Sequence, residues 1–192
     1  MVSENETATF CHLIRSRSKE NKIAIDILYS SKNIIIGPAL SILRQELDSM
    51  VRVIYLLNIK LLPERNRIIS QTLNGEQWTI KTNKGKLRKI TDREMIDISN
   101  DLYGWTLSVY KFGCSFIHLS NFHNYLSENP ISMLSDCEKE DIINHMKQYH
   151  GYNSETLTIQ DIWNYIPHIF DKISSNLNCY VDGLLNNSRS SL

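Results

Sequence analysis

The sequence contains few residues that interrupt helices, with only 7 glycines and 4 prolines among 192 residues. Glycine and proline most strongly mark turns and helix ends. Here they fall mainly between long segments in which apolar residues repeat at helical spacing. We therefore expect an all-α fold, a helical bundle of about five to seven helices. It would form a single domain over 1–192, with its core in about 34–185 and a polar tail at 186–192.

Several classes of protein are disfavoured by what is missing. The four cysteines include no CxxC pair, so neither a zinc ribbon nor a dense disulfide framework is expected. Lysine plus arginine and aspartate plus glutamate both total 21, so no overall charge attracts nucleic acid or membrane. The longest apolar-rich stretch, 51–62, carries polar residues and is too short to span a bilayer. We expect a cytoplasmic protein that has no membrane segment.

Nucleotide-binding, protease and esterase motifs are also missing. No GxGxxG, GxxxxGK[ST], HExxH or GxSxG occurs. Cys114 and His118 have the spacing of two metal ligands on a helix, but no second pair accompanies them, and two ligands do not make a structural zinc site. His145 and His150 are expected to be surface groups. We expect no metal and no cofactor.

Capping patterns and apolar spacing locate the helices. The expected helices are about 3–29, one from Pro38 towards Pro63, a short one to 73, then 91–119, 135–149 and 158–185. Apolar residues at alternating steps of four and three predict two buried stripes. The core expected from these stripes is Leu43, Leu47, Met50, Ile54, Trp105, Val109, Phe112 and Phe116.

Residues 76–90 break the helical pattern and form either a small hairpin or an irregular arm. The segment 78–82 alternates like a strand and 83–85 reads as a turn. Five cations in nine residues would create a local positive field suited to RNA or another phosphate-bearing ligand. A solvated loop is the alternative. The cations are Lys81, Lys84, Lys86, Arg88 and Lys89.

The helix expected at 91–119 has a second, polar edge. Its residues step by four and three, and they are Gly104, Ser108, Lys111, Ser115 and His118. A histidine that moves a proton and a cation that stabilises a charged phosphorane suit metal-independent RNA cleavage. Lys111, Ser115 and His118 are therefore candidate catalytic residues. The alternative is that these polar groups are satisfied at a contact between helices.

Part of this polar edge also lies in a segment that resembles a known protein family. The segments SILRQELDSMVRVIYLL (41–57) and YKFGCSFIH (110–118) resemble uncharacterised bacterial all-helical proteins related to the HEPN (higher eukaryotes and prokaryotes nucleotide-binding) superfamily. The resemblance covers about 34–125. It rests on an arginine and a glutamate in the second helix and on a Y-x(4)-S-x(2)-H run. In this sequence these residues are Arg44, Glu46, Tyr110, Ser115 and His118.

The resemblance implies a role but leaves catalysis open. Many members of that superfamily are ribonucleases of toxin and phage-defence systems, which act as dimers and carry an arginine, four to six residues and then a histidine. This sequence has Lys111, six residues and then His118. Lysine lacks the two-pronged contact that arginine makes with phosphate. Several HEPN-like domains are non-catalytic partners.

Three functions remain open from the sequence. The first is a HEPN-like protein of a bacterial defence or stress system that acts by self-association, as a homodimer, or by binding a protein partner or RNA. The second is a metal-independent ribonuclease that uses His118 and Lys111. The third is an immunity or scaffold protein with no role in nucleic-acid binding.

Overall fold

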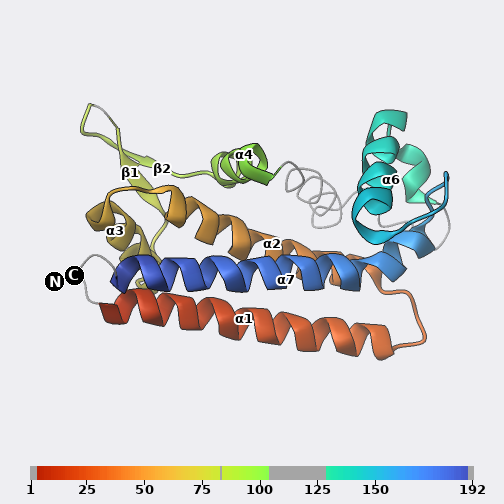
Figure 1. The fold of residues 1–192 in the computed structure, drawn as a ribbon, viewed down its shortest axis with the longest axis horizontal. Coiled ribbons are helices and arrows are strands. Elements are labelled where there is room, and N and C mark those ends of the chain that lie inside the picture. Colours follow the sequence, from red (N-terminus) through yellow and green to blue (C-terminus); the bar gives the residue numbers. More distant parts are fainter. Residues whose placement is uncertain (1–3, 83, 104–128, 190–192) are drawn as a thin grey trace.

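The computed structural model describes residues 4–82, 84–103 and 129–189, and it confirms an all-α fold (Figure 1). Within these ranges six α-helices are joined by one short 3₁₀ helix and one two-stranded hairpin. The elements are α1 (Glu4–Ser30), α2 (Ile36–Asn58), α3 (Leu62–Leu73), β1 (Thr79–Lys81), β2 (Leu87–Lys89), α4 (Asp92–Tyr103), η2 (Pro130–Met133), α6 (Asp136–His150) and α7 (Ile159–Arg189).

The three longest of the described helices, α1, α2 and α7, form the body of the protein and lie side by side (Figure 1). The stripe predicted on α2 faces the core: its first four members are at most 3% exposed, and Leu57 is partly buried at the edge of the core. These four are Leu43, Leu47, Met50 and Ile54. Phe10 from α1 and Phe170 from α7 are fully buried in the same core. The other expected core residues, Trp105, Val109, Phe112 and Phe116, lie outside the described residues.

The predicted helix ends are largely confirmed. Ser135 and Glu138 form a reciprocal capping box at the start of α6, and Gly151 ends that helix with a φ of +68°. A left-handed φ favours glycine because other side chains are strained there. Thr158 and Asp161 bond reciprocally at the start of α7. The described helices include none long and apolar enough to cross a bilayer.

Candidate functional site

The segment 76–90 is a hairpin that projects beyond α3 (Figure 1). Strands β1 and β2 are antiparallel, with Ile80 opposite Arg88. The backbone N–H of Thr82 donates to the carbonyl of Lys86 at 2.8 Å and so extends the pairing towards the tip. Gly85 adopts a φ of +73°, which closes the turn. Of the two alternatives left open for 76–90, a small hairpin or an irregular arm, the structure shows the hairpin.

Trp78 fixes the base of the hairpin to the helical body. Its ring is 5% exposed, and its indole N–H donates to the hydroxyl of Thr72 on α3 at 2.6 Å. The guanidinium of Arg52 lies 5.1 Å from the centre of the ring, within the range of a cation–π contact. The residue just before β1 is thus held by both α2 and α3.

Two further side chains of α3 hold Thr79, the first residue of β1. The side-chain amide of Gln71 accepts the Thr79 backbone N–H at 3.0 Å and donates to its hydroxyl at 2.8 Å. Arg67 donates to the Thr79 carbonyl at 2.5 Å and to Glu64 at 2.7 Å. The bond from Arg67 lowers the pKa of Glu64 below its usual value. These contacts leave the hairpin little freedom to swing as a loose loop.

The hairpin carries exposed positive charge, as the sequence predicts. All five cations are exposed, and four of them form no ion pair with a carboxylate in the described part of the chain. These four are Lys81, Lys84, Lys86 and Lys89. Hairpin residues also line a shallow hollow of about 680 Å³, and the cations among them are Lys81, Lys84, Lys86 and Arg88.

Arg88 differs from the four lysines because an acid already holds it. Its guanidinium makes two parallel bonds to the carboxylate of Glu94 on α4, at 2.7 and 2.8 Å. This bonding raises the pKa of Arg88 and lowers that of Glu94. Thr91 and Glu94 also have the spacing of a capping box, which is a sequence signal for a helix start. The Thr91 hydroxyl accepts the Glu94 backbone N–H at 3.2 Å, and a backbone hydrogen bond from Thr91 also helps to lower the pKa of Glu94. The Glu94 carboxylate therefore contacts both its own helix start and the hairpin.

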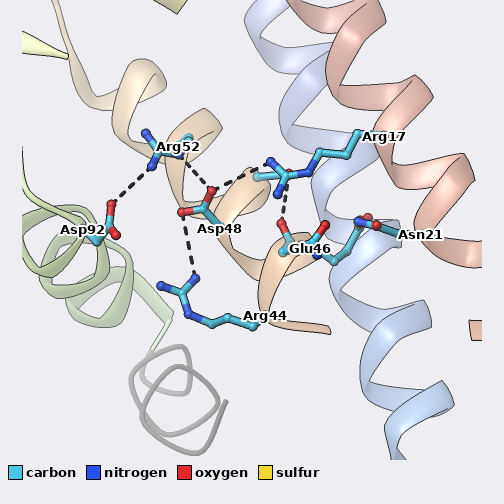
Figure 2. A network of polar contacts seen from close by, with 9 residues as sticks. Arg17, Asn21, Arg44, Glu46, Asp48, Arg52 and Asp92 are labelled. Carbon is cyan, nitrogen blue, oxygen red and sulfur yellow. Dashed lines mark hydrogen bonds and ion pairs between the residues drawn. The ribbon is translucent and has the colours of Figure 1, made fainter. Parts of the chain in front are cut away.

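A second polar cluster lies inside the body, around Glu46 (Figure 2). Glu46 is 0% exposed, although its side chain is a carboxyl group. The hydroxyl of Ser18 donates to one carboxyl oxygen, and the amide of Asn21 donates to the other at 2.9 Å. The Ser18 hydroxyl also lies 3.1 Å from that of Ser174 on α7. These bonds join α1, α2 and α7 through one buried acid.

Asp48, two residues after Glu46 on α2, is surrounded by arginines (Figure 2). Arg52, four residues further along α2, binds it at 3.0 Å, and this spacing favours such a pair on a helix. Arg17 and Arg44 each approach it at 3.9 Å. Arg52 also reaches Asp92 at the start of α4, at 3.2 Å. Of the residues that carry the family resemblance, Glu46 thus joins α2 to α1, and Arg44 pairs with Asp48 within α2.

The candidate catalytic residues Lys111, Ser115 and His118 lie outside the described residues, as does Cys114. A catalytic edge on that helix therefore stays a prediction. The described ranges contain no group of three or more acidic, histidine or cysteine side chains placed to hold a metal ion.

His145 on α6 was expected to be a surface group, and this expectation is wrong. The imidazole is half-buried, and burial, with a smaller contribution from Lys172, lowers its pKa below 6.5. The sequence pattern predicted helix α6, but it did not show that the side of the helix that carries His145 is partly buried. The neutral form of His145 is therefore favoured in the folded protein.

The depressed pKa of His145 predicts a pH dependence of stability. Between the folded pKa and about 6.5 the unfolded chain binds more protons, so the free energy of unfolding should fall as the pH is lowered through this window. Urea denaturation at a series of pH values measures it. The variant His145→Gln should show a flatter dependence, and an unchanged profile would contradict the burial of this imidazole.

Comparison with known protein families, with curated proteins and with solved structures finds no match.

Proposed function

We propose that the protein binds a nucleic-acid partner by its phosphate backbone, on the β1–β2 hairpin. RNA is the partner expected from the sequence and is the first probe. One observation carries the proposal: four exposed lysines without a carboxylate partner among the described residues project on a hairpin that α3 holds in place. They are Lys81, Lys84, Lys86 and Lys89.

The physical case rests on local charge and on preorganisation. The net charge of the protein is zero, so attraction of a polyanion must come from clustered cations. Phosphates that meet these lysines release condensed counterions, which is the main source of affinity in sequence-independent binding. Because Trp78 and Thr79 are fixed by side chains of α2 and α3, little backbone entropy is lost on binding.

The salt dependence of RNA binding tests the proposal. Fluorescence anisotropy of a labelled single-stranded RNA, from about 50 to 200 mM salt, should show affinity falling linearly on a double-logarithmic plot. In the variant K81Q/K84Q/K86Q the slope should become shallower by about 2, or ~0.7 for each lost phosphate contact. If the parent bound neither this RNA nor duplex DNA at low salt, the proposal would be overturned.

The family resemblance is the basis for a proposal about the biological role of the protein. This role is that of a HEPN-like protein of a bacterial defence or stress system, which acts as a homodimer or with a protein partner. The burial of Arg44 and Glu46 among helices supports it, because residues shared within a helical family are often those that join its helices. Sedimentation velocity tests the homodimer.

A metal-independent ribonuclease that uses His118 and Lys111 remains the alternative. Incubation with total RNA, with and without a chelator, separates binding from cleavage. An immunity or scaffold role without nucleic acid would follow if neither binding nor cleavage occurred.

A further inference from the structure

The two faces of the hairpin both carry cations. Directly opposite residues in an antiparallel pair project from the same face. The pairing of Lys81 with Leu87 and of Thr79 with Lys89 places two lysines on one face. Lys86, opposite Thr82, and Arg88, opposite Ile80, lie on the other face. The positive charge is thus divided between both sides of a two-stranded ribbon.

Within the part of the chain that the structure describes, the body contacts the two faces at the base of the hairpin. Thr79 is held against α3 on one side, and Arg88 is held by Glu94 of α4 on the other. The outer part, from Lys81 through the turn to Leu87, projects beyond these contacts (Figure 1). This outer part consists of the pairs Lys81–Leu87 and Thr82–Lys86, each with a rise of about 3.4 Å along the strands, and the turn. The tip of the hairpin therefore extends on the order of 10 Å beyond the body of the protein.

From this arrangement we propose that the hairpin enters the major groove of double-stranded DNA. A single strand lying on the protein would meet one face of the ribbon, whereas a groove presents phosphates on two sides. The major groove of B-form DNA is about 12 Å wide and 8.5 Å deep, and it admits a two-stranded ribbon. The major groove of A-form RNA is too deep and narrow for side chains to read. The inference rests on the proposed binding of phosphate and adds the form of the nucleic acid.

Leu87 is an independent reason to prefer a groove. Its side chain is 62% exposed on the same face as Lys81, in the middle of a basic ribbon. An exposed leucine contributes nothing to the attraction of phosphates. Inside a major groove it would meet base edges, where the methyl group of thymine offers an apolar contact. Lys84, in the turn, would enter deepest.

Three labelled probes of one sequence test the inference with the full-length protein: duplex DNA, duplex RNA and single-stranded DNA. At equal salt the DNA duplex should bind at least about tenfold more tightly than the other two. Glucosylated 5-hydroxymethylcytosine, which fills the major groove, should remove most of this preference. A ligand that occupies the minor groove should leave it intact.

Single variants on the two faces distinguish insertion from surface contact. Lys81→Gln and Lys86→Gln should each make the salt slope on duplex DNA shallower by about 1, whereas Lys19→Gln on α1 should leave it unchanged. Groove insertion would be overturned if all three probes bound with equal, salt-dependent affinity, or if only one of the variants Lys81→Gln and Lys86→Gln changed the salt slope. The proposed function would stand in both cases. Failure to bind any probe at low salt would overturn both.

Discussion

Replacing Phe170 with alanine is expected to lower the free energy of unfolding by about 3–5 kcal/mol. Phe170 is 0% exposed and is one of the largest fully buried side chains of the protein. It lies on α7, which packs against both α1 and α2. Its removal leaves a cavity among the three longest helices, in addition to the lost transfer of an aromatic ring from water.

Urea denaturation followed by circular dichroism measures this change, and Leu61→Ala is the matched control. Leu61 is 72% exposed in the connection before α3, so its truncation should alter stability by no more than about 0.5 kcal/mol. A loss for Phe170→Ala no larger than that of the control would show that α7 does not pack as described.

Replacing Glu46 with leucine is expected to lower the free energy of unfolding by about 1–3 kcal/mol, although leucine is apolar and similar in size. The reason is the pair of donors that Glu46 leaves behind. The Ser18 hydroxyl and the Asn21 amide are both buried in α1, and both donate to this carboxyl group. Without it, the Asn21 amide loses its bond of 2.9 Å in the interior.

A combined variant shows whether the lost bonds cause the effect. In S18A/N21L/E46L both sides of the network become apolar, so much of the stability lost in E46L should return. The three residues are in contact, so their effects should not add. A combined loss equal to the sum of the single losses would mean that packing, and not hydrogen bonding, accounts for the result.

The buried stripe of α2 and the ends of α6 could be predicted because each depends on neighbours in the sequence. Leu43 and Leu47 are one helical turn apart, and the Ser135–Glu138 box is completed within a single turn. The alternation and the turn within 76–90 are local signals too, but they left an irregular arm open beside the hairpin that the structure shows.

The side chains that hold the hairpin could not be predicted, because their contacts join different elements. Nothing in the spacing of Arg67 and Gln71 indicates that both bond to Thr79. The role of Glu94 was missed for a related reason. The local pattern places Glu94 in the first turn of a helix, but it does not show that Arg88 lies within reach of the carboxylate.

The polar middle of α1 shows how burial reverses a local expectation. Its composition predicts a flank that faces water, and Lys19 and Glu20 are indeed exposed. Ser18 and Asn21 are buried among them because the acid on α2 requires donors. Arg65 is similar: only 8% exposed, it donates to the carbonyl of Ile59 at 2.7 Å, near the end of α2.

The five cations of the candidate site were predicted from the sequence, but their availability was not. Only the structure shows that Arg88 differs from the four lysines, because Glu94 already binds its guanidinium with two hydrogen bonds. It also shows that Trp78 is buried at the base and takes part in anchoring the strand.

The most direct test of nucleic-acid binding by the hairpin compares two variants of equal charge. K81Q/K84Q/K86Q removes three lysines of the hairpin, and K19Q/K32Q/K60Q removes three exposed lysines outside it. Binding of labelled RNA and of duplex DNA is measured by anisotropy for both variants and the parent, at one low salt concentration. The hairpin variant should lose at least about tenfold in affinity for the preferred probe while the control stays close to the parent. Equal losses in the two variants would mean that net charge alone governs binding, and the account of the hairpin would be wrong.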